Sequence, residues 1–337
     1  MFYETDMSNK NTNLHRAKKT KDDEFYTTYE TVANELSKYK EQFTNKVVFC
    51  NCDDPLKSNF CKYFVDNFNF FGLKRLICTS YISSESLQTE LLEIHKSQPK
   101  TEQKYGKILD ITEINDNFNL NKSVKWLKGN GDFQSDECTE LLKECDIVVT
   151  NPPFSLFKKF ILQIMKHNKK FLVIGNQNAL TYKEIFPLVQ SNQIWTGYKF
   201  GEMKFRVPAN SEPRSTRYWV DETGQKWRSL GNAMWLTNLD NERRHETLKL
   251  FHKFNPQIHQ KYDNFDAIHV RNITEIPFDY KGIMGVPITI INRYNSDQFE
   301  IVGEANHGCD NEFDFFKPTI NGKETFKRIL IRNKYVG

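Results

Sequence analysis

The sequence lacks the segments that carry a chain into or across a membrane. No window approaches the run of about 18 apolar residues that a membrane helix needs, and the N-terminal residues contain no apolar stretch of a signal peptide. A C-x-x-C pair is also missing, although seven cysteines are present, at positions 50, 52, 61, 78, 138, 145 and 309. These absences argue against secretion and against a metal site, so we expect a cytoplasmic protein with reduced, buried thiols.

Strong charge of either sign is missing as well. The formal net charge is +4 over 337 residues, which permits a nucleic-acid partner without demanding one. Hydrophobic residues make up 38% and charged residues 27% of the chain, as in an ordinary soluble globular protein. No internal repeat is apparent. The length suits one large α/β domain with an appendage, or two domains.

The first half of the chain alternates between helical and strand-like segments. Apolar residues at helical spacing and short β-branched runs follow one another from Tyr29 to Asn176. We expect helices over 29–39, 58–71, 138–145 and 157–167, and strands within 46–52, 73–81, 124–133, 146–150 and 169–176. Strands joined by helices at these intervals form βαβ crossovers. The predicted fold is α/β, with a doubly wound, mostly parallel sheet that binds ligands at the carboxyl ends of its strands.

That edge of the predicted sheet gathers several polar segments. The segments that follow the expected strands are CNCDDP, GNGDF, TNPPF and IGNQN. Two other segments do not follow the alternation of helices and strands. Residues 1–20 are polar and without periodicity, which predicts a flexible basic arm. Residues 83–123 are charged and irregular, and within them only 86–95 has a helical pattern.

The second half changes character. Residues 198–232 are rich in cations and aromatic residues and indicate a hairpin or a long loop, followed by a strand over 232–239. A helix is expected over 242–254. From 256 onward, short strands such as those in 285–294 and 298–305 alternate with Pro and Gly, which predicts a smaller β-containing region.

The segment DIVVTNPPFSLF, residues 146–157, ends a buried-type strand on an amide, two prolines and a phenylalanine. The side-chain oxygen of Asn151 and the backbone carbonyl of Pro152 can converge as two acceptors. Proline stiffens such a turn and removes competing N–H donors. Two acceptors suit an NH2 group, and the ring of Phe154 suits a planar heteroaromatic base.

An amine on a planar ring, above all N6 of adenine, fits this cluster. Its lone pair is delocalised, and two acceptors that pull on its protons make the nitrogen more electron-rich, so that methyl transfer from a sulfonium becomes feasible. A duplex adenine must be flipped out to reach such a pocket, where it would stack on Phe154. The cluster alone is also compatible with a rigid turn without function, but its place on the predicted ligand edge favours catalysis.

Several blocks of the sequence resemble a known family in the same order along the chain. Residues 151–154 match the [DNS]-P-P-[FYW] motif of S-adenosylmethionine-dependent amino-methyltransferases, and the chain more narrowly resembles the EcoRI-type adenine-specific (N6) DNA methyltransferases. The blocks are DEFYTTYETVANEL (23–36), VVFCNCDDPLKSNFCKYF (47–64), GDFQSDE (131–137), DIVVTNPPFSLF (146–157), KKFLVIGNQNALTYKEIFPL (169–188) and DYKGIMGVPITI (279–290). The resemblance covers nearly the whole chain, least well at 83–123, and implies the Rossmann-like methyltransferase fold.

The resemblance also implies roles for individual residues. The catalytic motif would be Asn151, Pro152, Pro153 and Phe154. The residues implied to bind S-adenosylmethionine are Tyr26, Thr27, Asn51, Asp53, Asp54, Pro55, Asp132 and Phe133. Within that set, 25–27 would lie near the methionine end of the cofactor, and 132–133 would contact its adenine.

One segment departs from the family pattern. Most relatives have a glycine-rich loop after the first strand, whereas CNCDDPLKSNF contains no glycine, so the residues of this loop that touch the cofactor are open. The second strand ends LICTSY, without the acid that usually holds the ribose hydroxyls. The residues left as candidates for that contact are Asp53, Asp54, Thr79, Ser80 and Tyr81.

The segment 199–228 is the candidate DNA-contacting loop. Cations can neutralise phosphates and aromatic rings can stack where a base has left, although a solvated hairpin has the same composition. The candidate DNA-binding residues are Arg206, Arg214, Arg217, Lys226 and Arg228. We expect a methyltransferase domain over 21–255 and target recognition in 256–337.

The leading hypothesis is a site-specific DNA adenine-N6 methyltransferase of a restriction–modification system. Its partner would be double-stranded DNA, with no membrane and no metal, and it would act as a monomer. A cognate endonuclease would act on the same site without a stable complex, and the resemblance suggests a palindrome such as GAATTC. Two alternatives stay open: methylation of RNA adenine or protein glutamine, and a non-catalytic DNA-binding protein on a methyltransferase fold.

Overall fold

The structure divides into two compact units. The computed structural model describes residues 25–82, 105–305 and 318–335. The first unit comprises Met1–Lys169, Val173–Gly175 and Gly201–Gly231, and the second comprises Lys170–Leu172, Asn176–Phe200 and Asn232–Gly337. The predicted arm at 1–20 and the predicted helix at 86–95 lie outside the described residues. The predicted domains, 21–255 and 256–337, differ from these units and stay a prediction about function.

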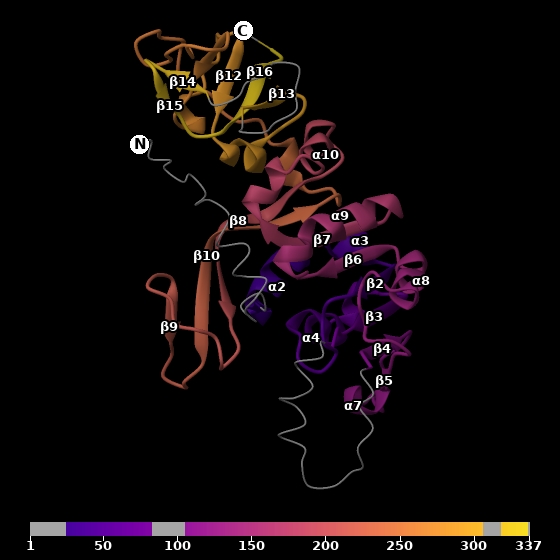
Figure 1. Ribbon diagram of the computed structural model, residues 1–337. Coiled ribbons are helices and arrows are strands. Elements are labelled where there is room, and N and C mark those ends of the chain that lie inside the picture. Colours follow the sequence, from indigo (N-terminus) through magenta and orange to yellow (C-terminus); the bar gives the residue numbers. More distant parts are fainter. Residues whose placement is uncertain (1–24, 83–104, 306–317, 336–337) are drawn as a thin grey trace, which may run out of the picture. The chain divides into compact units, whose positions relative to one another are not determined.

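One large sheet has ten strands in the order β1-β8-β10-β7-β6-β2-β3-β4-β5, with β9 paired to β10 (Figure 1). The strands are β1 Tyr26–Thr27, β2 Val47–Cys50, β3 Arg75–Thr79, β4 Lys107–Ile111, β5 Val124–Trp126, β6 Ile147–Thr150, β7 Lys170–Asn176, β8 Trp195–Arg206, β9 Tyr218–Val220 and β10 Lys226–Thr237. Three of them, β7, β8 and β10, contribute residues to both units.

The sheet is mixed. At its centre β2 runs parallel to β3 and to β6, as the crossover pattern predicts. Toward the ends of the order, β4 is antiparallel to β3 and to β5, and β1 is antiparallel to β8. The sequence did not indicate β4, because it lies in the irregular segment 83–123. The α/β class is therefore confirmed, the sheet is less parallel than expected, and the doubly wound arrangement stays a prediction.

Short hydroxyl side chains begin the main helices of the first unit. Thr28 caps α2, and Ser58 and Ser135 cap α4 and α8, each by accepting a backbone N–H of the first turn. The α-helices are α2 Tyr29–Leu36, α3 Lys40–Phe43, α4 Asn59–Asp66, α5 Phe68–Phe71, α7 Leu120–Ser123, α8 Asp136–Glu144, α9 Phe157–Lys166 and α10 Phe186–Gln190. The 3-10 helices are η1 Ser37–Tyr39, η2 Phe154–Leu156, η3 Gln177–Thr181, η4 Glu242–His245, η5 Ile273–Glu275 and η6 Ile288–Arg293. The four helices predicted in the first half are confirmed, with 58–71 split into α4 and α5.

The core of the first unit lies around its central strands. Every residue of β2 and β6 is buried, which accounts for their apolar sequences, broken only by Thr150 at the end of β6. Helix α9 packs closely on the sheet, because a Cβ at Gly175 would lie 2.4 Å from the ring of Phe157. Each large apolar side chain buried here contributes about 1.5–3 kcal/mol to folding.

Two of the cysteines are paired. Cys61 on α4 and Cys78 on β3 form a disulfide, with their Cα atoms 6.3 Å apart. The expectation of reduced thiols is therefore wrong for this pair, because the packing of α4 on β3 brings together residues that no sequence spacing connects. Cys50, Cys52, Cys138 and Cys145 are free.

The second unit contains a smaller sheet in the order β11-β12-β16-β13 and a two-stranded ribbon, β14-β15. The strands are β11 Ala267–His269, β12 Ile283–Val286, β13 Phe299–Ala305, β14 Thr319–Ile320, β15 Lys323–Glu324 and β16 Arg328–Asn333. The β-containing character predicted for 256–337 is confirmed. The strand expected within 285–294 stops at Val286, because Pro287 has no N–H and the chain turns into η6.

The helix expected over 242–254 is wrong. Only η4 forms, and side chains from elsewhere satisfy the backbone groups that a helix would use. The side-chain amide of Gln298 makes two hydrogen bonds to the backbone of Leu248. It accepts from the N–H and donates to the carbonyl, both at 2.7 Å. The apolar residues of this segment are not part of a core: Leu248 and Leu250 are only half-buried, and Phe251 is 78% exposed.

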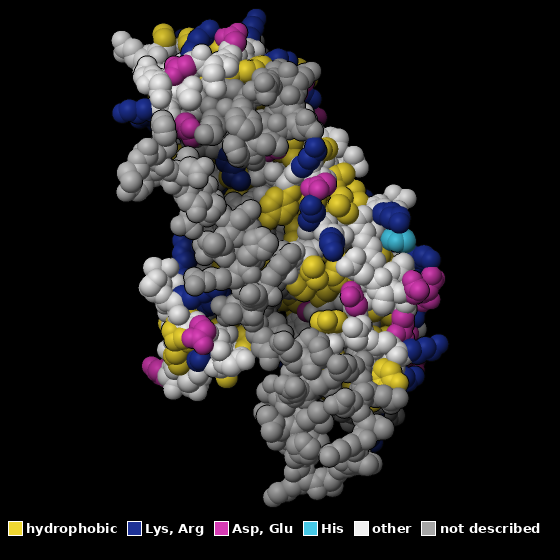
Figure 2. Space-filling model, in the orientation of Figure 1, with side chains coloured by type: hydrophobic (Ala, Val, Ile, Leu, Met, Phe, Trp, Pro, Cys, Tyr) yellow, Lys and Arg dark blue, Asp and Glu magenta, His cyan; other side chains and the backbone are white. Residues whose placement is uncertain are grey.

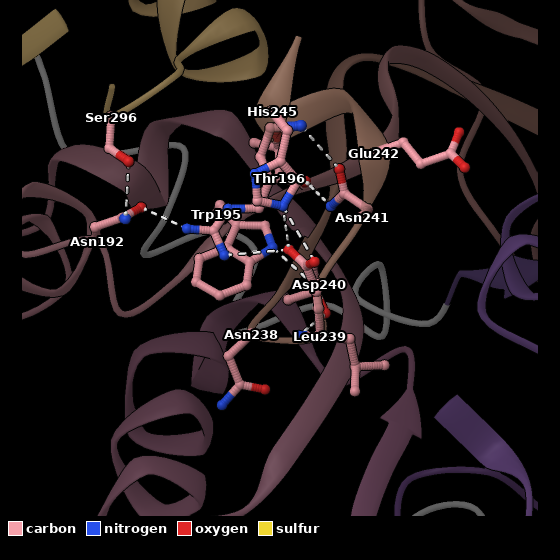
Figure 3. Close-up of polar contacts among 12 residues, drawn as sticks. Asn192, Trp195, Thr196, Asn238, Leu239, Asp240, Asn241, Glu242, His245 and Ser296 are labelled. Carbon is pink, nitrogen blue, oxygen red and sulfur yellow. Dashed lines mark hydrogen bonds and ion pairs between the residues drawn. The ribbon is translucent and has the colours of Figure 1, made fainter. Parts of the chain in front are cut away.

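A polar network fixes the start of that segment within the second unit (Figure 3). Trp195 Nε1 donates to the carbonyl of Leu239 at 2.8 Å, and Asn241 Nδ2 donates to the carbonyl of Thr196 at 3.2 Å. The guanidinium of Arg244 lies 3.5 Å from the centroid of the Trp195 ring. These contacts tie the residues after β10 to the beginning of β8.

Candidate active site

A pocket of about 490 Å³ lies in the first unit, where β2 and β6 end. Segments far apart in the sequence supply its walls. They are residues 25–27, 51–54, 57–60, 80–82, 107, 131–133, 151–154 and 156. The pocket thus brings together three of the four polar segments that the sequence places on one edge, whereas IGNQN after β7 does not line it.

Asn151 follows β6 and has a fixed amide orientation. Its Nδ2 donates to the carbonyl of Phe25 at 2.7 Å and lies 3.3 Å from the Thr27 hydroxyl oxygen, which accepts the second bond. A carbonyl can only accept, so the nitrogen and not the oxygen must face Phe25. The Oδ1 of Asn151 is buried and has no hydrogen-bond partner in the described part of the chain. Such an acceptor is costly to leave unpaired, by about 1–3 kcal/mol, and suits a donor from a ligand.

Phe154 belongs to an aromatic stack. Its ring stacks on that of Phe25, with centroids 5.4 Å apart and planes 25° apart. Phe25 also meets Phe205 edge-on at 5.4 Å, and the guanidinium of Arg228 lies 5.1 Å from its centroid. One face of Phe154 is therefore covered by Phe25, and a base that stacks on Phe154 must use the other face or displace Phe25.

Asp53 holds the loop after β2 in place. Its Oδ1 accepts from the Ser58 hydroxyl at 2.6 Å, and its Oδ2 accepts from the Thr150 hydroxyl. Its N–H donates to the carbonyl of Thr79 at 2.9 Å. Burial raises the pKa of the Asp53 carboxyl to about 6, against the opposing effect of the two hydroxyl donors. Through its carboxylate and its backbone N–H together, Asp53 thus connects the loop after β2 to the ends of β3 and β6 without any glycine in the loop.

The other loop residues differ in what they offer to a ligand. Asn51 lines the pocket, and its Oδ1 is buried without a partner among the residues described. Asp54 lines the pocket beside Lys107, whose Nζ lies 3.3 Å from its Oδ2. Pro55 is buried and does not line the pocket. Of the hydroxyl candidates at the end of β3, Ser80 and Tyr81 line the pocket and Thr79 does not.

A close contact between two backbone segments occurs at Gly131, which also lines the pocket. Gly131 has φ +79°, and a Cβ there would lie 2.0 Å from the carbonyl oxygen of Ser80. Only glycine fits this position. The next residues, Asp132 and Phe133, line the pocket, with the Phe133 ring packed edge-on against Phe160 at 5.2 Å.

The segment 199–228 contains β9 and parts of β8 and β10. In the sheet β10 lies next to β8, and β9 pairs antiparallel with β10; these three strands are called the ribbon. Trp219 and Trp227 are cross-strand partners whose rings stack 6.1 Å apart. Lys204 lies 5.9 Å from the centroid of Trp219, and the guanidinium of Arg206 lies 5.4 Å from that of Trp227. The ribbon therefore carries a row of alternating cations and indoles.

The remaining predicted DNA-binding residues are placed differently. Lys226 is half-buried and donates to the carbonyl of Ser211 at 3.0 Å, inside the ribbon's own loop. Arg217 has φ +57°, and its guanidinium packs against Gly231. A Cβ added at Gly231 would lie only 1.8 Å from Nη1 of Arg217. Arg214 is exposed. On the face shown in Figure 2, Lys and Arg side chains are spread among acidic and apolar ones rather than gathered in one patch.

Sequence reasoning missed several pocket residues. Phe25 was implied only as part of a family segment, and its stacking on Phe154 depends on pairing of β1 with β8. Lys57, Ser58 and Lys107 also line the pocket. The hydroxyl at Ser58 had a local signal, since a serine before an apolar helical run predicts a cap.

Neither a metal centre nor a membrane span is found in the described ranges. No group of three or more His, Cys, Asp or Glu side chains there is placed to hold a metal ion. Burial raises the pKa of the Cys50 and Cys52 thiols well above the ordinary value, which disfavours the thiolates that metals bind. No helix among those residues is long and apolar enough to cross a membrane.

Comparison with known proteins gives consistent matches along the chain. Residues 13–334 match the family model described as adenine-specific methyltransferase EcoRI. Type II methyltransferase M.EcoRI of Escherichia coli is 46% identical over 333 residues, covering 95% of this chain and 96% of that protein. Type II methyltransferase M.MgeORF184P of Mycoplasma genitalium is 39% identical and covers 96% and 99%. Type II methyltransferase M.MpnI of Mycoplasma pneumoniae is 36% identical and covers 86% and 84%.

Proposed function

Because this chain belongs to the adenine-specific methyltransferase EcoRI family, we propose that it methylates N6 of adenine within a specific DNA sequence. The methyl donor is S-adenosylmethionine, which the family uses as methyltransferases generally do. Relatives named as Type II methyltransferases support a role in a restriction–modification system. The chain would then protect its own site from a cognate endonuclease, as a monomer that acts on one strand at a time.

The observation that carries the proposal is the unpaired Oδ1 of Asn151. Both donor contacts of its amide nitrogen are taken by Phe25 and Thr27, so the oxygen is held as an acceptor beside the prolines. Together with the carbonyl of Pro152 it would accept both protons of an adenine amine. This polarisation makes N6 more electron-rich at the moment when it attacks a methyl group, and the effect is largest in a site that excludes water.

No separate strong base is required of the chain. The nitrogen becomes cationic as the new N–C bond forms, and a proton on such a nitrogen is lost readily to water. The flipped adenine would stack on the face of Phe154 that Phe25 leaves open, or would take the place of Phe25. Pro153 would keep the turn rigid, because its carbonyl accepts from the N–H of Leu156 at 3.0 Å and so starts η2.

The pocket residues fit S-adenosylmethionine, which supplies an electrophilic methyl group when bound. The unpaired Oδ1 of Asn51 suits the ammonium group of its methionine end. Asp132 would accept from the amine of its adenine and Phe133 would pack beside the ring, as the family resemblance implies. Asp54, which pairs with Lys107, would hold the ribose hydroxyls.

The other implied cofactor residues take indirect roles in this proposal. Both carboxylate oxygens of Asp53 already accept hydroxyl hydrogen bonds, so Asp53 would shape the loop. Pro55 would stiffen it from a buried position. Tyr26 lines the pocket and is 43% exposed, so it can cover a bound ligand.

DNA would meet the ribbon of β8, β9 and β10. The exposed side chains of Lys204 and Arg206 can neutralise phosphates, and the stacked indoles can pack against an unpaired strand. Arg214, Arg217 and Arg228 would add contacts from the same ribbon. Residues 256–337 would supply further contacts for target recognition.

A methylation assay tests the proposed function. The purified chain is incubated with methyl-labelled S-adenosylmethionine and either duplex DNA or RNA, and the modified base and its context are located by long-read sequencing. We expect N6-methyladenine in DNA at one short recurring sequence. No detectable binding of S-adenosylmethionine, with or without DNA, would contradict the proposal.

Asn151→Ala provides the mutational test of the site. We expect loss of methyl transfer with cofactor and DNA affinities retained, because the acceptor is removed while the pocket walls stay. The matched control is Asn34→Ala, which truncates an exposed asparagine on α2 and should leave turnover unchanged. Near-normal turnover of Asn151→Ala would rule out the two-acceptor mechanism.

A further inference from the structure

Strand β1 is only two residues long but is held on two sides. Tyr26 and Thr27 pair with Arg206 and Phe205 of β8. The side chain of Asn59, at the start of α4, donates to the carbonyl of Thr27 at 2.7 Å. The position of β1 is therefore set by elements of the first unit other than the strand that carries Asn151.

From this position Thr27 of β1, together with Phe25 just before it, presents two acceptors to the amide nitrogen of Asn151. The Phe25 carbonyl can only accept, whereas the Thr27 hydroxyl can also donate. The carbonyl of Phe25 lies 2.7 Å and the hydroxyl oxygen of Thr27 lies 3.3 Å from Nδ2. An amide nitrogen has two N–H donors, so this pair of acceptors can engage both. Turning the amide over would bring Oδ1 against the Phe25 carbonyl, which is repulsive.

We propose that β1 and the preceding Phe25 position Asn151, that Thr27 is a positioning residue, and that the Phe25 carbonyl requires an amide rather than a carboxylate at position 151. The inference rests on the proposed function and deepens it. The family motif permits Asp or Asn at its first position, and in this chain the Phe25 carbonyl decides between them. A carboxylate at 151 would place an oxygen next to that carbonyl with no proton between them.

The two possible roles of Thr27 have different signatures. If its hydroxyl bound the cofactor, as the family resemblance implies, its loss would weaken cofactor affinity. If it holds the Asn151 amide, its loss would leave that affinity intact and slow the methyl-transfer step. The amide would keep its bond to Phe25, so the loss should be partial, about tenfold.

The experiment compares three variants. Thr27→Val removes the hydroxyl and keeps the β-branched shape, and Thr27→Ser restores the hydroxyl. Thr28→Val is the matched control, because the Thr28 hydroxyl caps α2 and contacts Thr31 without touching Asn151. For each variant, the single-turnover rate on saturating duplex DNA, the Kd for S-adenosylmethionine and the Kd for DNA are measured.

We expect Thr27→Val to slow single-turnover methylation about tenfold with both Kd values within about twofold of wild type. Thr27→Ser should recover to within about threefold, and Thr28→Val should lower thermal stability without slowing the step. A wild-type rate for Thr27→Val, or a loss confined to cofactor affinity, would overturn the inference. Absence of methylation by the wild-type chain would instead overturn the proposed function, so the two failures are distinguishable.

Discussion

At the scale of single residues, one buried carboxylate fixes a loop that contains no glycine. Asp53 anchors this loop to Ser58 and Thr150 by hydrogen bonds. A glycine is required instead at Gly131, whose backbone packs against the carbonyl of Ser80. The loop is therefore fixed by hydrogen bonds to a charge that burial disfavours.

This burial predicts a pH dependence of stability. Burial raises the pKa of the Asp53 carboxyl from its ordinary value of 3.8 to about 6 in the folded chain, so the folded state binds its proton more tightly. Stability from this group therefore falls as pH rises from about 4 to 6, by up to about 3 kcal/mol, and is constant above that range. Asp53→Asn mimics the neutral form, so its stability relative to wild type should increase over this interval.

Urea unfolding of both proteins between pH 4 and pH 8 measures that difference. Asp54→Asn serves as the control, because it removes a charge from the same loop but one that is paired with Lys107. A difference between Asp53→Asn and wild type that does not vary with pH would show that Asp53 keeps its ordinary titration.

A second prediction at this scale concerns Asn151→Asp. The substitution keeps an acceptor for the adenine amine but removes the donor that the Phe25 carbonyl requires, whereas the Thr27 hydroxyl can turn and donate to the carboxylate. We expect the single-turnover rate to fall by at least about 100-fold. The hydrogen bond to the Phe25 carbonyl is lost, and a carboxylate is left beside that carbonyl; each change costs over about 1 kcal/mol. Activity close to wild type would mean that β1 moves when the substrate binds.

Some residues of the site could be predicted from a short stretch of sequence, and others only from the tertiary fold. Asn151 to Phe154 could be predicted because one contiguous motif contains the amide, the stiff turn and the ring. The stacking of Phe25, the pairing of Cys61 with Cys78 and the salt bridge of Lys107 could not, since each joins segments that only the tertiary fold brings together.

At the scale of elements, the ribbon of β8, β9 and β10 connects the predicted DNA surface to the pocket. The exposed residues Lys204 and Arg206 lie over Trp219 and Trp227. Between them in sequence, Phe205 is buried and packs edge-on against Phe25. Alternation along β8 thus gives one face to cations and the other to the aromatic stack.

Arg206→Ala tests the outer face of this ribbon. If Arg206 neutralises one phosphate, its removal should reduce the slope of log K against log salt concentration by about 0.9. The measurement is DNA binding by anisotropy at several salt concentrations, with Lys143→Ala on α8 as an exposed cation outside the ribbon. An unchanged slope for Arg206→Ala would remove this residue from the DNA interface.

Helices and strands also differ in how well their own sequences predict them. Capped amphipathic helices such as α2 and α8, and the fully buried strands β2 and β6, were predictable because their patterns agree with local capping and burial. The segment 242–254 was not, because Gln298 and other side chains supply its hydrogen bonds from outside. Strand β4, which lies between β3 and β5, was not indicated because it falls in the irregular segment 83–123.

At the scale of the whole molecule, three strands pass through both compact units. Residues of β7, β8 and β10 are divided between the units, so neither can unfold completely without disrupting strands of the other. We therefore expect a single calorimetric transition. At 100-fold excess over its Kd, S-adenosylmethionine should stabilise the folded chain by about 2.7 kcal/mol and shift that transition upward as a whole. Two transitions, of which the cofactor moves only one, would contradict this cooperativity.

The pairing of β1 with β8 also has a consequence for the timing of synthesis. Tyr26 leaves the ribosome about 180 residues before its partner Arg206. At about 5–20 residues per second, roughly 10–40 s separate the two. Asn151 is made within that interval, before the strand that holds its orienting acceptors has a neighbour. The nascent chain therefore cannot complete its pocket early, and activity should appear only after most of the ribbon has been translated.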